Sequence, residues 1–283
     1  MFWLYLIAFS VLLYSIAIIL QRVLLKDDKI DPIAYSIFFQ FIAGFLIGAY
    51  GFILGGMTFS NMKPLIFNII LMILLWSFSN IFSFKALKTI EASEYTIIFT
   101  SRTLFTVITS AIFLGNILTH KQILGGLLII IATVLAVYKN TKFKFKIGEL
   151  YALLGAMAFG FETTNDKIIL SSFKLYPYVT IAYLFPALFM LFLFPKSILR
   201  MKDILNKKRI FKVLLFCGLL AISSLAFFSA LQIATNASQV VILNQVTTIV
   251  IVLMGIIFLK ERDNMPRKLL AAILSVVGVI LTI

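Results

Sequence analysis

Apolar residues occur in long runs along this chain, and short polar stretches separate the runs. Most runs approach 20 residues, the length at which a helix crosses the roughly 30 Å hydrocarbon core of a bilayer. The pattern predicts an all-α membrane protein with ten membrane-spanning helices. The predicted spans are 2–21, 32–54, 65–86, 94–114, 122–138, 149–170, 177–195, 211–232, 238–259 and 267–283. The connections are short, and only 55–64 and 196–210 have room for structure of their own.

The composition agrees with a membrane protein. Of the 283 residues, 62% are hydrophobic and 13% are charged, whereas soluble domains usually carry about 25% charged residues. The net charge of +14 comes from Lys and Arg in short loops, where these residues orient helices and contact anionic headgroups rather than nucleic acid. The single cysteine, Cys217, and the single histidine, His120, exclude an internal disulfide and a His/Cys metal site. No cofactor is expected.

The two halves of the chain repeat one another at a spacing of 145 residues. EASEYTIIFTSRTLFTVITSAIFLG (91–115) aligns with NASQVVILNQVTTIVIVLMGIIFLK (236–260), and the KIDP and KLYP stretches before the second and seventh spans align as well. Apolar helices resemble one another by composition, so a single match would mean little, but several blocks share this spacing. We therefore expect two five-helix repeats, residues 1–145 and 146–283.

Because five is an odd number, the second repeat would enter the membrane upside down relative to the first. Inverted repeats are common in secondary transporters, which bind substrate near the bilayer midplane where the halves meet. The predicted architecture is therefore two inverted five-helix repeats around a central cavity. Most of the 25 Lys and Arg residues flank the loops after odd-numbered spans, which predicts that those loops are cytoplasmic and that both termini are not.

With ten helices in two repeats, EAS and NAS opening the fourth and ninth spans, and FLKER closing the ninth, the chain resembles the EamA-like branch of the drug/metabolite transporter superfamily. The resemblance covers essentially the whole chain. It implies a multi-pass protein of the cell membrane, monomeric or homodimeric, that exports or exchanges small organic solutes such as amino acids, metabolites or drug-like compounds. The chain departs from the family at FLGNILT, where FLGERLT is usual, and at Arg102, where many members carry proline or an apolar residue. Most members also have cytoplasmic termini, opposite to the charge count.

Arg102 lies midway along the fourth predicted span. A charge near the bilayer centre costs at least about 2.5–3.5 kcal/mol, so it usually faces a cavity or a partner. On a helical wheel Tyr95, Thr106 and Thr109 lie within about 60° of it, and we expect this polar stripe to line the cavity. Arg102 would either bind an anionic group of the substrate, for which a planar guanidinium is suited, or pair with Glu162.

Glu162 lies deep in the sixth predicted span, in the stretch AFGFETTNDK. A carboxyl group in hydrocarbon favours its protonated form, so Glu162 is a candidate proton-coupling residue. The small multidrug-resistance relatives carry an embedded Glu in their first helix, and the resemblance therefore points the same way. An adjacent Arg102 would oppose protonation, so the two roles compete.

The next two charges in this stretch, Asp166 and Lys167, align with Gln21 and Arg22 and are expected to mark a helix end, with Asn165 at the cavity mouth. Other polar residues of the spans are uncharged, and they either line the cavity or hydrogen-bond between helices. The remaining candidates for the cavity are Trp76, Asn80, Ser224, Asn244 and Gln245.

Among functions, secondary transport of small organic solutes across the lipid bilayer fits best. Arg102 favours a substrate with an anionic group, whereas a lone Glu162 would favour a cation. The alternative is a flippase for lipid-linked sugars, which would need a cavity open laterally to lipid. An enzyme is not expected, because one terminal histidine and one mid-membrane acid do not make a catalytic constellation. The sequence has no nucleotide-binding fingerprint, which argues against ATP-driven transport by this chain alone.

Overall fold

The structure is a computed structural model that describes residues 2–54, 56–58, 62–114, 119–137, 146–170, 172–233, 243–261 and 264–282. These residues are helical apart from short connections, and no strand occurs among them. The elements are α1 (Phe2–Leu25), α2 (Pro32–Ile53), the short 3-10 helix η1 (Lys63–Leu65), α3 (Ile66–Thr89), α4 (Ala92–Phe99), α5 (Arg102–Leu114), α6 (His120–Val137), α7 (Ile147–Leu170), α8 (Leu175–Leu193), α9 (Ser197–Ile204), α10 (Lys207–Ile233), α12 (Val246–Phe258) and α13 (Met265–Thr282). The all-α prediction is confirmed, and α9 occupies one of the two longer connections.

Five helices are long and apolar enough to cross a membrane, namely α1, α2, α3 extended by η1, α8 and most of α10; the described part of the chain shows no others of that kind. Two further helices, α6 and α12, are apolar but shorter. Ten continuous spans are therefore not confirmed. Charged residues interrupt the apolar character of α7, which carries Glu149, Glu162 and Asp166, and the fourth predicted span is broken.

The break divides the fourth predicted span into α4 and α5 at Thr100 and Ser101. Backbone hydrogen bonds tighten there to three-residue spacing, from the Leu104 amide to the Ser101 carbonyl (2.9 Å) and from the Thr103 amide to the Thr100 carbonyl (3.0 Å). The local sequence TSRT explains the break, because Ser and Thr hydroxyl groups compete for backbone hydrogen bonds. A turn at Gln245, 145 residues after Thr100, precedes α12 in the second half.

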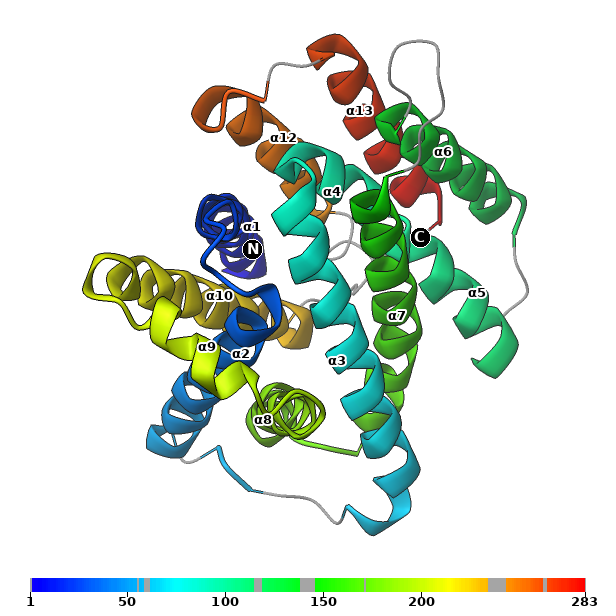
Figure 1. The fold of residues 1–283 in the computed structure, drawn as a ribbon. Helices are drawn as coiled ribbons and strands as arrows, with labels where there is room; N and C mark the ends of the chain where they lie inside the picture. The colour runs from blue at the N-terminus through cyan, green and yellow to red at the C-terminus, as the bar shows by residue number, and fades with distance from the viewer. Residues whose placement is uncertain are drawn as a thin grey trace.

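Helix pairing follows the same internal symmetry (Figure 1). α3 packs along α7, and α10 packs along α1, while α2 pairs with α8 and α6 pairs with α13. Both ends of α7 lie 145 residues after the ends of α1, and both ends of α13 lie 145 residues after those of α6. The halves thus resemble each other in helix length and in packing partners as well as in sequence.

Individual hydrogen bonds repeat as well. The Ser79 hydroxyl of α3 donates to the Gly155 carbonyl of α7 over 3.1 Å, and the Ser223 hydroxyl of α10 donates to the Ser10 carbonyl of α1 over 3.0 Å. Gly155 lies 145 residues after Ser10, and Ser223 lies 144 residues after Ser79, so both bonds join equivalent helix crossings. Small residues at these crossings allow the backbones to approach closely, as is usual between helices in lipid.

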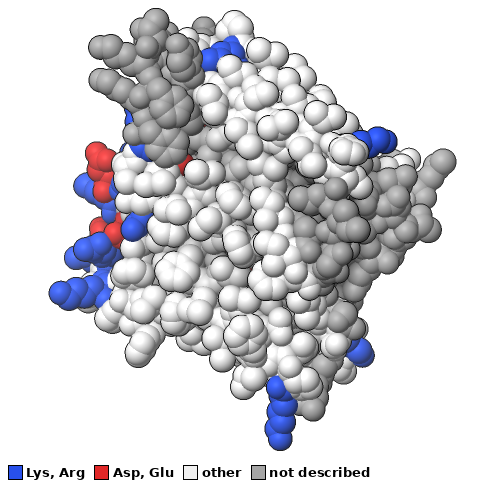
Figure 2. Space-filling view, turned by 90° about the vertical axis from the view of Figure 1, so that its right-hand side faces the viewer, with Lys and Arg blue, Asp and Glu red and all other residues white. Residues whose placement is uncertain are grey.

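Charged side chains gather at the ends of the bundle. On the face shown in Figure 2, Lys and Arg crowd the left edge together with the visible acidic residues, a few more cations lie at the top, right and bottom edges, and uncharged residues fill a broad area between them. Many large apolar side chains are exposed in the described residues, among them Phe45, Phe192 and Phe211. An apolar surface of this kind matches the hydrocarbon layer of a bilayer.

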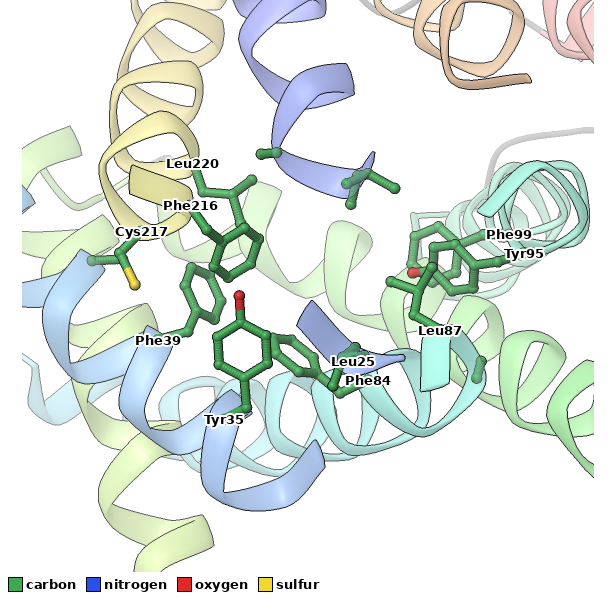
Figure 3. Close-up of a cluster of buried hydrophobic side chains, with 14 of the residues drawn as sticks. Leu25, Tyr35, Phe39, Phe84, Leu87, Tyr95, Phe99, Phe216, Cys217 and Leu220 are labelled. Atoms are coloured by element: carbon green, nitrogen blue, oxygen red, sulfur yellow. The ribbon is translucent and has the colours of Figure 1, made fainter. Parts of the chain in front are cut away.

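The interior is rich in aromatic side chains (Figure 3). Tyr35 and Phe39 of α2, Phe84 of α3 and Phe216 of α10 pack with ring centroids between 5.1 and 6.4 Å apart. Cys217 lies beside this group and is fully buried, as expected for a small core residue. Edge-on and tilted ring pairs of this kind stabilise a core beyond the area that they bury.

A buried network of hydrogen bonds and one ion pair joins the two halves where α4 begins. The Glu261 carboxylate, which follows α12, accepts hydrogen bonds from the amide of Ala92 (3.0 Å) and from the amide and hydroxyl of Ser93 (3.1 and 2.7 Å). Lys268 of α13 forms an ion pair with Glu91 and donates to the Glu261 carbonyl over 3.2 Å. The FLKER stretch thus supplies the N-terminal cap of a helix in the other half.

Candidate functional site

A small cavity lies where the break between α4 and α5 faces the turn before α12. Its walls come from α1, α4, α5 and α12 and include Tyr14, Tyr95, Arg102, Gln245 and Thr248. Its volume is about 20 Å³, which is room for about one water molecule. This space lies where the two halves meet, but it is too small for an organic solute, so the central substrate cavity stays a prediction.

Arg102 is held between two aromatic rings at the edge of this cavity. Its guanidinium carbon lies 5.1 Å from the centroid of Phe99 and 4.8 Å from the centroid of Phe159, and these two rings meet edge to face at 5.5 Å. Cation–π contacts stabilise a desolvated guanidinium by about 0.5–2 kcal/mol without neutralising its charge. Arg102 forms no ion pair with any described residue.

The predicted pair of Arg102 with Glu162 is absent from this conformation. Glu162 lies on α7, where its polar neighbours include Trp76 of α3 and Asp166 of its own helix. The rings of Trp76 and Phe159 meet edge to face at 5.3 Å, so two aromatic side chains link the charged groups instead of a salt bridge.

Glu162 is 1% exposed, and neither of its carboxyl oxygens accepts a hydrogen bond from a described residue. The indole nitrogen of Trp76 is likewise buried without a hydrogen-bond partner in that part of the chain. Asp166 lies one helical turn further along α7 and accepts a hydrogen bond from the hydroxyl of Tyr178 on α8. α7 ends at Leu170, so Asp166 lies about one helical turn before the end of the helix, in keeping with the expectation that it marks a helix end.

Asn165 also joins helices. Its side-chain amide donates to the Asn68 carbonyl over 2.8 Å, and the Asn68 amide donates back to the Asn165 side-chain oxygen over 2.7 Å. These reciprocal bonds connect α7 to the beginning of α3 and satisfy a buried residue that was expected at a cavity mouth. The side chain of Lys167 lies outside the described residues.

Only part of the predicted polar stripe on the fourth span faces the cavity, because Tyr95 and Arg102 line it and the two threonines do not. The hydroxyl of Thr106 donates to the Gly160 carbonyl of α7 over 3.2 Å, and Thr109 and Thr164 share a hydroxyl hydrogen bond of 2.7 Å. Both threonines therefore face α7 rather than the cavity. The helical wheel assumed one continuous helix, whereas the break before Arg102 separates the rotational phase of α5 from that of α4.

The other predicted site residues divide between the cavity and its surroundings. Gln245 lines the cavity, whereas the hydroxyl of Ser224 lies 3.1 Å from that of Tyr183 on α8. The Asn80 side-chain amide donates to the Trp76 carbonyl of its own helix over 2.9 Å. The Asn244 carbonyl accepts a hydrogen bond from the hydroxyl of Thr247 in α12 over 2.7 Å.

Sequence reasoning missed two aromatic residues, Tyr14 and Phe159. Tyr14 lines the cavity, and Phe159 contacts Arg102. A signal was available, because the two positions lie 145 residues apart and are therefore equivalent in the repeats.

Comparisons with known proteins agree with this arrangement. The model of the EamA-like transporter family matches the chain twice, at residues 1–138 and 146–283. A solved structure titled "Crystal structure of protein" has a TM-score of 0.61 and 15% sequence identity, covering 98% of this chain and 94% of that chain. At this identity the likeness concerns the fold alone. No curated protein sequence matches.

Proposed function

Because the chain belongs to the EamA-like transporter family, we propose that it is a secondary transporter that exports or exchanges small organic solutes by alternating access. Amino acids, metabolites and drug-like compounds carrying an anionic group are the solutes that its site favours. Family membership supports solute transport across a membrane, and the details of the site support the choice of solute.

The observation that carries the proposal is the state of Arg102. It lies at the interface of the halves, borders a small cavity, and has aromatic rings rather than a carboxylate beside its guanidinium. An arginine in a membrane interior is costly, and a ligand with a carboxylate or phosphate group would supply the missing charge and bidentate hydrogen bonds. We assign Arg102 as the anchor for an anionic group.

The cavity also suggests how the site opens. A volume of about 20 Å³ is too small for an organic solute, so on this proposal the helices around the cavity separate before a solute enters. Thr100 and Gln245 interrupt the helices at equivalent positions beside the cavity. Half-helices that meet at a site near the midplane are typical of transporters with internal repeats, in which the halves rock around a fixed site.

The test is counterflow of a panel of radiolabelled anionic, neutral and cationic solutes in proteoliposomes. Arg102→Gln should weaken the binding of anionic solutes about 10- to 100-fold, the equivalent of one charge-assisted hydrogen bond, and should affect neutral solutes less. Arg102→Lys should be intermediate, because an ammonium group keeps the charge but loses the planar fork. Lys202→Gln, an exposed cation on α9, is the matched control. Unchanged affinity of Arg102→Gln for every anionic solute would refute the assignment.

A lateral groove bears on the alternative of lipid-linked sugar flipping. It lies between α2 and α8, has a volume of about 380 Å³, and is lined by apolar residues and Thr180. A flippase needs polar side chains along its lateral opening to solvate the sugar headgroup, and this groove offers only the hydroxyl of Thr180. The groove therefore supports solute transport over lipid flipping.

A further inference from the structure

The small cavity between the halves has an unbalanced positive charge in its wall. It lies among α1, α4 and α5 of the first half and α12 of the second, and α12 packs against both α4 and α1 (Figure 1). Among the described residues that line it, Arg102 is the one charged side chain, and none is acidic. Arg102 also forms no ion pair elsewhere in the described part of the chain.

The wall also holds hydrogen-bond donors that are not in use. The hydroxyl groups of Thr96, Thr100 and Thr247 donate to nearby carbonyl oxygens of the backbone. The side-chain amide of Gln245 and the hydroxyl of Thr248 form no hydrogen bond with a described residue, although these two residues are only 3% and 1% exposed. Buried donors without partners are costly, so a ligand that accepts hydrogen bonds would be stabilised here.

The size of the space limits what this ligand can be. With a volume of about 20 Å³ the cavity takes about one water molecule. A water molecule would use some of the donors but would leave the guanidinium charge unbalanced. A chloride ion is only slightly larger than water, accepts hydrogen bonds from any direction, and balances that charge. Charge-assisted hydrogen bonds of this kind are about twice as strong as neutral ones.

We propose that the cavity is a halide site, in which one chloride ion binds between Arg102 and Gln245 when no organic solute is present. The guanidinium supplies the charge, and the Gln245 amide and the Thr248 hydroxyl donate hydrogen bonds to the ion. This site goes beyond the proposed function. Only its competition with an anionic solute rests on that function, because Arg102 would then serve both anions.

The ion would connect the two halves. Arg102 begins α5 in the first half, whereas Gln245 precedes α12 in the second. A ligand that binds one conformation stabilises it by mass action, so chloride between these two side chains favours the arrangement of the halves seen here. During alternating access the ion therefore has to leave before the halves separate around a solute.

Binding of radiolabelled chloride to the purified protein tests the site without any solute. In gluconate buffer the wild type should bind one chloride per chain, and bromide should displace it. Arg102→Gln should weaken binding about 10- to 100-fold, through loss of a charge-assisted hydrogen bond. Lys202→Gln removes an exposed cation and should bind as the wild type does. A wild type without saturable chloride binding, or an equal loss in Lys202→Gln, would overturn the proposal.

Gln245→Glu gives a second, sharper test, because it keeps the shape of the side chain and places a carboxylate beside Arg102. The new charge should balance the guanidinium from within the wall and exclude chloride. The unfolding midpoint of the wild type should rise when chloride replaces gluconate, and that of Gln245→Glu should not respond. Asn206→Asp, which adds a carboxylate at an exposed position, should respond as the wild type does. A full chloride response in Gln245→Glu would contradict the placement of the ion.

Counterflow in proteoliposomes tests the competition. At a chloride concentration ten times its dissociation constant, the apparent KM of anionic solutes should rise about tenfold relative to gluconate, while that of neutral solutes stays unchanged. An unchanged KM for anionic solutes would show that solute and ion do not share Arg102 and would refute the competition. If the wild type exchanges no solute at all, the proposed function fails, and chloride binding still decides whether the ion is there.

Discussion

Glu261 offers a sharp test of how the halves are held together. Its carboxylate is 3% exposed and accepts three hydrogen bonds from Ala92 and Ser93 at the beginning of α4. The residue before this helix, Glu91, forms no cap hydrogen bond of its own and pairs with Lys268 instead. We therefore predict that Glu261→Ala destabilises the protein by uncapping a helix that belongs to the other half.

The magnitude follows from the groups left behind. Loss of an N-cap costs about 0.5–2 kcal/mol, and each buried amide left without a partner costs about 1–3 kcal/mol. Because these figures describe the same bonds, they are not added, and a total of about 2–4 kcal/mol is expected for Glu261→Ala. Glu261→Gln keeps an acceptor oxygen and should lose about half as much. Ser93→Ala removes one donor and should cost about 1 kcal/mol.

Cys217 provides the assay. It is the only cysteine of the chain and is fully buried, so a thiol-reactive fluorogenic dye will label it when the bundle unfolds on heating. At roughly 2–4 °C per kcal/mol, Glu261→Ala should lower the midpoint by roughly 4–16 °C, with the other two variants between it and the wild type. A Glu261→Ala midpoint within about one degree of the wild type, with Ser93→Ala clearly lower, would show that the carboxylate is not the cap.

Three further predictions test the packing and the site. Gly160→Ala should destabilise the protein by about 1–3 kcal/mol, because its new Cβ would lie 2.6 Å from the Arg102 carbonyl oxygen. Gly218→Ala, with no atom within 4 Å of its Cβ, should be neutral or stabilising. Thermal unfolding followed by circular dichroism measures both variants. Asp31→Ala removes the side chain that caps α2 and should cost about 0.5–2 kcal/mol in the same assay; an unchanged midpoint would contradict the capping role. Phe159→Leu removes one of the two rings around Arg102 and should change the counterflow KM of anionic solutes while leaving that of neutral solutes within about twofold; equal changes for both classes would indicate a packing defect instead.

The scaffold was largely predictable because its signals are long and repeated. Runs of apolar residues fix where helices lie, and the spacing of 145 residues gave the relation between the halves that the matched bounds of α1 and α7 now show. The break at Thr100 and Ser101 was not predicted, because a helical wheel treats the whole span as one unbroken helix. The TSRT sequence was a signal for it, since such hydroxyl groups often interrupt helices.

The site was only partly predictable for a different reason. Arg102 and Gln245 are polar residues in apolar helices, and that contrast alone identified them as candidates, as it did Glu162. Which side chains touch is decided by helix packing, however, and no spacing rule shows that Phe159 lies between Arg102 and Trp76. The cap that Glu261 provides crosses from one half to the other, which no local pattern encodes.

The symmetry of the scaffold and the asymmetry of its charges together constrain the proposed transport cycle. Arg102 has Thr247 at the equivalent position of the other half, and Glu162 has Ala17. If the halves exchange conformations during alternating access, these charges meet different surroundings in the two end states, so the states cannot have equal free energy. Binding of an anion at Arg102 cancels the charge of the guanidinium. The two halves of the loaded protein then differ less in charge than those of the empty protein. The free-energy difference between the two end states is therefore smaller when solute is bound, and the empty carrier reorients more slowly. Counterflow, in which the carrier crosses loaded both ways, should therefore be faster than net transport.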